Sequence, residues 1–261
     1  MGAAARIGLE RWRHVVKLDP DKPLPAWIVR RIAASGTDAV VIGGTQRLTR
    51  AKVLRLLWLL RHAPVPVCIE VTAVACAVPG ADAYLVPLVL NTEDPRWFIG
   101  HHLDGLARVG ARVPWDRVLA EGYIIGNPDS AAARRAQAVA PSRRRLATLV
   151  QFGAGVLDLP VVYLEYSGRA APDEAVAAAA RALRGIRAGG SRSRLFYGGG
   201  IAGYEGARKR LQQVDTIVVG NVLYTPRGLE ALEATLAAAA IPQVPGSPAA
   251  RADSAWEDGV P

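Results

Sequence analysis

Eight short apolar runs, rich in Val, Ile and Leu, constrain the fold of this chain more than any other feature. Gly, Pro or Asp bounds each run, and helical patterns separate most of them. Continuous apolar runs are typical of strands covered on both faces, and eight of them alternating with helices favour a closed parallel barrel over an open sheet. The predicted fold is therefore a (β/α)8 barrel of the TIM type. Its strands are expected at residues 14–19, 38–44, 65–72, 83–90, 122–128, 161–167, 195–201 and 216–221.

One gap between these runs is too short for a normal helix. Residues 73–82 separate the third and fourth runs and contain the turn signal Pro79-Gly80. A parallel crossover that includes a helix needs about a dozen residues. We therefore expect a modified barrel that lacks the regular helix between strands 3 and 4. The other gaps predict helices at residues 25–35, 49–62, 95–109, 143–157, 173–186, 204–213 and 229–240.

The alternating pattern also defines the domain organisation. It covers residues 12–240, a suitable length for one barrel domain. Residues 1–11 are expected to be a flexible N-terminus, and residues 241–261, rich in Pro, Ser, Ala and Gly, a disordered C-terminal tail. No apolar run is long enough to span a membrane and residues 1–11 do not form a signal peptide, which favours a cytoplasmic protein. Cys68 and Cys76 fit neither a disulfide framework nor a zinc site, so they should be reduced thiols.

Arginine accounts for much of the basic charge. The formal net charge is +9, and the arginines lie among alanines rather than among aromatic residues that could stack on bases. This pattern favours solvated helix faces over a nucleic-acid site, and we expect no nucleic-acid partner. The clustered residues are Arg134, Arg135, Arg143, Arg144, Arg145, Arg181, Arg184, Arg187, Arg192 and Arg194.

The first two predicted strands end in polar residues, where a barrel of this type carries its site. Lys17 and Asp19 have the same parity and should face the same side of the sheet. Such inward charges are costly unless a ligand uses them or they form a structural ion pair with each other. Gly43 and Gly44 then allow close approach of a ligand, and Thr45 adds a hydroxyl near the Asp19 carboxylate. Together with ligand oxygens and water these groups suit Mg²⁺, although as a metal motif the pattern is weak alone.

The last three strand ends predict an acid–base group and a phosphate site. Tyr163, Glu165 and Ser167 share one face, and Glu165 is the candidate to orient or deprotonate a substrate hydroxyl. Glycine-rich strand ends at 198–200 and at 220–221 offer bare backbone amides beside helix N-termini, which is how such barrels bind phosphate. A tight turn with no ligand is the alternative for residues 198–200.

Seven motifs in order resemble one family of enzymes. They are WRHVVKLDPDK (12–22), SGTDAVVIGGT (35–45), VPGADAYLVPLVLN (78–91), EGYIIGNPD (121–129), LPVVYLEYSG (159–168), LFYGGGI (195–201) and DTIVVGNVLY (215–224). The chain resembles the geranylgeranylglyceryl and heptaprenylglyceryl phosphate synthases. These prenyltransferases join a polyprenyl diphosphate to the 3-hydroxyl of sn-glycerol 1-phosphate, forming an ether lipid and releasing diphosphate. The family fold is a barrel that lacks one helix.

The resemblance implies roles for individual residues. Asp19 and Thr45 would hold Mg²⁺ and, through it, the prenyl diphosphate. Glu165 and Lys17 would be the catalytic residues. The glycerol 1-phosphate site would consist of Lys17, Tyr163, Leu164, Glu165, Tyr166, Ser167, Gly168, Gly200, Gly220 and Asn221.

The resemblance also bears on the donor and the assembly. In the family, a bulky residue at the end of the helix after strand 4 limits the length of the prenyl chain. Val109 matches this position and is small. The resemblance therefore favours heptaprenyl diphosphate as the donor, with the geranylgeranyl donor as the alternative. Ala75 and Ala136 replace the Glu and Thr that family members usually or often carry. The family implies a homodimer with peripheral contact to a membrane surface.

Two other functions remain open from the residues alone. One is another phosphate-binding barrel enzyme, an isomerase or lyase of a phosphorylated metabolite, which would need a second acid or base besides Glu165. The other is a non-catalytic basic barrel that binds an anionic membrane or nucleic acid. It would not need Lys17, Asp19, Thr45 and Glu165 together at strand ends.

Overall fold

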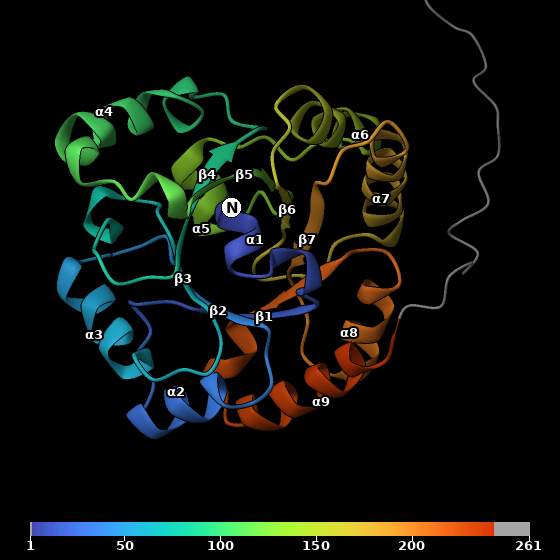
Figure 1. The fold of residues 1–261 in the computed structure, drawn as a ribbon. Coiled ribbons are helices and arrows are strands. Elements are labelled where there is room, and N and C mark those ends of the chain that lie inside the picture. Colours follow the sequence, from blue (N-terminus) through green and yellow to red (C-terminus); the bar gives the residue numbers. More distant parts are fainter. Residues whose placement is uncertain (1, 243–261) are drawn as a thin grey trace, which may run out of the picture.

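The computed structural model describes residues 2–242, and in them eight parallel strands close into a barrel in the order β1 to β8 (Figure 1). Closure is direct, since β1 pairs with both β2 and β8 in parallel register. The predicted barrel is thus confirmed. The strands are β1 (His14–Leu18), β2 (Ala39–Ile42), β3 (Val67–Glu70), β4 (Ala83–Val89), β5 (Val118–Ile125), β6 (Val161–Glu165), β7 (Arg194–Gly198) and β8 (Thr216–Val219).

Helices surround the strands as an outer layer (Figure 1). Thr49 caps α3 as its sequence position suggests, because its side chain accepts a hydrogen bond from the Lys52 N–H. The helix expected at 95–109 is instead two pieces, the 3₁₀ turn Pro95–Trp97, which Asp94 caps, and α4. The helices are α2 (Ala26–Ala33), α3 (Arg50–Leu60), α4 (Gly100–Val109), α5 (Ala131–Ala136), α6 (Arg143–Gln151), α7 (Asp173–Ala188), α8 (Tyr204–Leu211) and α9 (Gly228–Ala240).

The crossover between β3 and β4 lacks a regular helix, as the sequence predicts. It contains the 3₁₀ turn Val74–Cys76. The neighbouring α4 has no buried residue, and Ile99, Leu103 and Leu106 expose between 40% and 58% of their surface there. This side of the barrel therefore offers apolar groups to solvent where a complete barrel would have another helix.

Alternation along each strand divides the core into two layers. Val16 and Leu18 of β1 face the helices, whereas Val15 and Lys17 face the barrel interior. The same parity brings polar side chains inward at the C-terminal ends of β3, β5 and β6. The charged groups of the site therefore lie directly above an apolar barrel interior.

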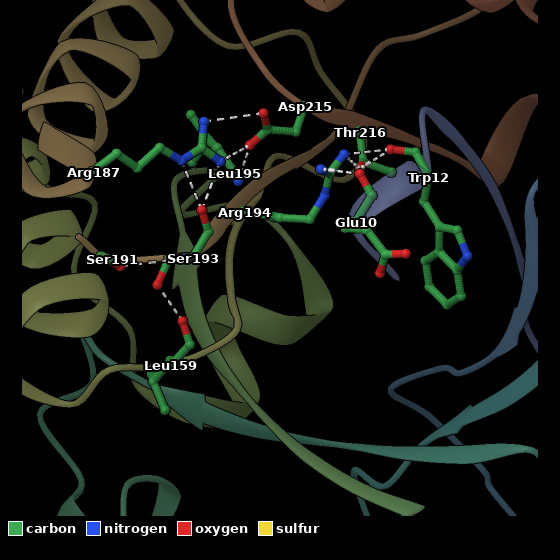
Figure 2. Close-up of polar contacts among 10 residues, drawn as sticks. All are labelled: Glu10, Trp12, Leu159, Arg187, Ser191, Ser193, Arg194, Leu195, Asp215 and Thr216. Carbon is green, nitrogen blue, oxygen red and sulfur yellow. Dashed lines mark hydrogen bonds and ion pairs between the residues drawn. The ribbon is translucent and has the colours of Figure 1, made fainter. Parts of the chain in front are cut away.

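The N-terminus differs from the flexible segment that we expected. Within residues 1–11, α1 (Ala3–Arg6) and the 3₁₀ turn Leu9–Arg11 pack on the N-terminal end of the barrel, with Ala3, Ile7 and Leu9 buried (Figure 1). Arg194 of β7 holds this segment, because its guanidinium donates 2.5 and 2.6 Å hydrogen bonds to the carbonyls of Glu10 and Trp12 (Figure 2). These three buried apolar side chains have no regular spacing, which is why the sequence did not predict this contact.

Two further expectations concern the ends and the membrane. Of the tail predicted at 241–261, residues 243–261 lie outside the described part of the chain. Within residues 2–242, no helix combines the length and apolar character that crossing a bilayer requires.

Candidate functional site

An open cleft of about 1080 Å³ lies at the C-terminal ends of the strands. Asp19 after β1 and Gly220 after β8 both line it, so the two predicted anion-binding regions share one rim. Parallel strands in a barrel end on the same face, which brings together groups far apart in sequence. Predicted site residues that line the cleft are Lys17, Asp19, Thr45, Tyr163, Glu165, Ser167, Gly168, Gly200, Gly220 and Asn221.

Three predicted residues do not line this cleft. Leu164 is fully buried and faces the helix layer, because it has the opposite parity to Glu165. Tyr166 also packs in that layer, beside Tyr197. Val109 lies at the end of α4, away from the cleft lining. Side-chain contacts with glycerol from Leu164 or Tyr166 are therefore excluded in this arrangement.

Lys17 pairs with Glu70, not with Asp19. Its ammonium donates 2.9 and 2.7 Å hydrogen bonds to the two carboxylate oxygens of Glu70 and a 3.0 Å hydrogen bond to the Tyr123 hydroxyl. Burial alone would lower the pKa of Lys17, but the nearby carboxylates of Glu70, Glu165 and Glu121 outweigh it, and the net pKa is raised. Lys17 is therefore a fixed cation whose three N–H donors are all engaged.

Glu70, Glu121 and Tyr123 are site residues that the sequence did not single out. All three point into the barrel. Tyr123 lines the cleft, whereas Glu70 and Glu121 lie beneath it and are 3% and 1% exposed. Burial first, and then the charge of Glu70, raise the pKa of Glu121 well above its usual range, and Glu121 Oε1 is a buried oxygen without a hydrogen-bond partner in the described part of the chain. An acid that ends a buried strand, as Glu70 does, was the available signal. Glu121 lay just before the predicted strand.

Glu165 is held from two sides. Its carboxylate accepts a 3.0 Å hydrogen bond from the Tyr123 hydroxyl and a 2.6 Å hydrogen bond from the Ser167 N–H. Burial and then Glu165 raise the pKa of Tyr123 well above its usual range, so the phenol stays protonated and able to donate. The result is a carboxylate in fixed orientation at the cleft floor, where it can accept a proton from a ligand hydroxyl.

Glycines at the end of β7, in the loop that follows it and directly after β8 leave parts of the rim without side chains. A Cβ on Gly198 would lie 2.2 Å from the Tyr163 hydroxyl, and one on Gly200 would lie 2.6 Å from the Ala170 nitrogen. Gly200 also has φ 62°, in the left-handed region. Gly220 precedes a 3₁₀ turn that begins at Asn221. These features make close approach of a phosphate to backbone amides feasible.

The Asp19 carboxylate faces a space that only glycine leaves open. A Cβ on Gly44 would lie 2.3 Å from Asp19 Oδ1. Nearby Asp21 is already paired with Arg47 and Lys52 at 2.9 and 2.7 Å. Residues 2–242 contain no cluster of three His, Cys, Asp or Glu side chains able to enclose a metal. One carboxylate and the Thr45 hydroxyl fit Mg²⁺, which usually keeps waters and substrate phosphates among its ligands.

These features define the class of TIM-barrel enzymes that bind phosphorylated ligands. The parallel barrel carries glycines after β7 and β8, a buried carboxylate on β6 and a carboxylate that faces the cleft after β1. The sequence comparison is more specific. Residues 7–239 match the PcrB family, and the chain belongs to that family.

Relatives of the chain carry names that agree with one another. The chain is 41% identical over 220 residues to heptaprenylglyceryl phosphate synthase of Brevibacillus brevis, covering 84% of this chain and 92% of the relative. It is 39% identical over 240 residues to the protein of that name in Geobacillus kaustophilus, covering 91% and 95%. Among solved structures, (S)-3-O-geranylgeranylglyceryl phosphate synthase from Thermoplasma acidophilum, in complex with sn-glycerol-1-phosphate, superposes with a TM-score of 0.77 at 20% identity, covering 91% of this chain and 98% of that one. At that identity the structural likeness supports the fold.

Proposed function

We propose that this protein transfers a prenyl group from a long polyprenyl diphosphate to the 3-hydroxyl of sn-glycerol 1-phosphate. The observation that carries the proposal is the placement of Glu165, the glycine loops and Asp19 around one cleft, in a chain whose relatives are named for this reaction. An isomerase or lyase would need a second acid or base facing the ligand. Glu121 has a raised pKa, but it is buried beneath the cleft and does not line it.

The acceptor binds on the β6–β8 side of the cleft. Its phosphate lies against the backbone amides of Gly200, Gly220 and Asn221, and its glycerol part lies along Tyr163 and Ser167. This orientation brings the 3-hydroxyl to Glu165, which takes its proton. The glycerol oxygen forms the new ether bond to the prenyl C1 atom as the bond from C1 to the diphosphate breaks, and diphosphate leaves with the electron pair of that bond.

The two anionic groups of the reaction, the acceptor phosphate and the donor diphosphate, bind on different sides of the cleft. Asp19 and Thr45 would hold Mg²⁺, which when bound neutralises charge on the diphosphate leaving group. Lys17 lies between the two sides and holds Glu70 and Tyr123 in place. For Lys17 to contact the acceptor, as the family resemblance implies, it exchanges its hydrogen bond to Tyr123 for one to a substrate oxygen. This exchange leaves the Glu70 pair intact.

The prenyl chain leaves the cleft toward the side without a crossover helix. A small apolar pocket adjoins the cleft there, lined in part by Pro87, Val89, Trp97 and Ile125. The exposed apolar residues of α4 continue in that direction, and Val109 lies at the end of that helix. A small residue at this position supports a donor longer than twenty carbons, with heptaprenyl diphosphate favoured.

Thermal shift measurements test the acceptor first. sn-Glycerol 1-phosphate should raise the melting temperature, and its enantiomer sn-glycerol 3-phosphate should raise it much less, because binding to the folded state stabilises in proportion to affinity. Equal shifts with both enantiomers contradict the proposed acceptor.

Product analysis tests the donor. Radiolabelled glycerol 1-phosphate, Mg²⁺ and prenyl diphosphates of graded length should give the longest ether products with the wild type and shorter ones with Val109→Trp. A strict twenty-carbon preference in both proteins refutes the role of Val109.

The assembly and location follow from the same proposal. We expect a homodimer in the cytoplasm that contacts the membrane holding its donor. Exposed Trp58 and Leu103 on α3 and α4 support the contact, with 57% and 58% of their surface accessible. Light scattering tests the dimer. Flotation with anionic vesicles tests the contact, and a Trp58→Ser/Leu103→Ser variant should float less.

A further inference from the structure

We infer that Arg135 binds the diphosphate of the donor, a role that rests on the proposed function. Arg135 lies on α5, within the arginine-rich segment that the composition alone assigns to solvated helix faces. The structure places its side chain across the top of the barrel. Its Nη1 atom donates a 3.0 Å hydrogen bond to the carbonyl of Thr45, 90 residues away.

The position of Arg135 lies between the polar and the apolar parts of the site. Arg135 lines the small apolar pocket, whereas Thr45, Tyr123 and Ala132 line both that pocket and the large cleft. A prenyl diphosphate has the same division, a charged head joined to an apolar chain. With its head near Asp19 and Thr45 and its chain directed toward the apolar pocket, the donor passes the Arg135 guanidinium.

The charge of Arg135 has no acidic partner in the described part of the chain. Within residues 2–242, none of the ion pairs within 4.0 Å includes it. Asp94, in the loop that precedes Trp97, is engaged by Arg96 through three side-chain hydrogen bonds of 2.8 to 3.1 Å. A guanidinium has five N–H donors in a planar fork that suits phosphate oxygens, so Arg135 keeps capacity for an anion.

The surroundings hold Arg135 in this place. Its guanidinium lies 5.4 Å from the centre of the Trp97 ring. Ser130 caps helix α5, because its hydroxyl accepts a 3.0 Å hydrogen bond from the Ala133 N–H. At the other end of the helix, the Thr92 hydroxyl, in the loop after β4, donates a 2.5 Å hydrogen bond to the Ala136 carbonyl. An arginine aimed by a capped, tethered helix loses less conformational freedom on binding than one on a loose loop.

Calorimetry with inorganic diphosphate and Mg²⁺ tests the inference without requiring catalysis. Arg135→Gln should weaken diphosphate binding about tenfold or more, because one charge-assisted pair is lost. Arg134→Gln is the matched control, since Arg134 is the adjacent exposed arginine on α5 and its guanidinium bonds the Asp129 carbonyl at 2.6 Å. This control should bind diphosphate as the wild type does. Diphosphate binding by Arg135→Gln equal to that of the wild type overturns the inference.

Steady-state kinetics separate a binding role from a structural one. Arg135→Gln should raise the KM for the prenyl diphosphate about tenfold and leave the KM for glycerol 1-phosphate unchanged. An equal rise for both substrates indicates that the loss of the Thr45 contact disturbs the whole site, and overturns the inference. If the wild type makes no ether product, the proposed function fails, while the diphosphate calorimetry still decides the role of Arg135.

Discussion

Buried His14 predicts how the stability of this protein depends on pH. Its ring lies at the N-terminal end of β1, with its two nitrogens 3.0 Å from the Thr37 and Thr235 hydroxyls, and it is 1% exposed. Burial lowers the pKa of His14 from 6.5 to about 4, and the charge of Asp38 offsets this only in part. The folded chain therefore takes up a proton at His14 less readily than the unfolded chain does.

The sign and size of the effect follow from this difference. Since the unfolded state binds the proton first, the contribution of neutral His14 to stability is complete above pH 6.5 and is lost as the pH falls toward 4. A tenfold difference in proton affinity is worth about 1.4 kcal/mol, so the loss amounts to about 3 kcal/mol in full. For a barrel of ordinary stability, about 5–15 kcal/mol, this is a substantial fraction.

Urea unfolding followed by circular dichroism between pH 7.5 and 4 measures the effect. The wild type should lose stability steadily below pH 6.5, whereas His14→Asn should be less stable at pH 7 but lose about 2 to 3 kcal/mol less over the same range. The control is His62→Asn, because His62 is exposed at the end of α3 and its replacement should keep the wild-type slope. Equal slopes for the wild type and His14→Asn refute the reasoning.

Three further predictions concern the site and the thiols. Glu165→Gln should lower kcat about a hundredfold or more with little change in the acceptor KM, and a kcat near that of the wild type excludes Glu165 as the base. Gly44→Ala places a methyl group 2.3 Å from Asp19 Oδ1, so the Mg²⁺ concentration for half-maximal activity should rise severalfold; an unchanged value argues against metal at Asp19. Cys68 and Cys76 are buried and burial raises the pKa of both thiols, so Ellman's reagent at pH 8 should label neither before unfolding, and prompt labelling contradicts their burial.

Local pattern predicted most of the architecture and ten of the residues that line the cleft. The apolar runs located the strands, and parity along β1 and β6 predicted that Lys17, Asp19 and Glu165 face the same cleft, because alternation is a property of one strand. The short segment before β4 predicted the missing helix from its length alone. The prediction that residues 1–11 form a flexible end was wrong, because this segment folds by packing on a surface that the barrel creates.

Partners across the barrel were decided only by the tertiary structure. Lys17 pairs with Glu70, 53 residues away, and Arg135 reaches Thr45, 90 residues away. Such pairs depend on the stagger between strands and on the closure of the ring, which no single segment encodes. The sequence by itself determined which residues lie at the strand ends and face inward. Closure of the barrel decided which of them touch, because only then do long-range electrostatic and packing energies select one arrangement.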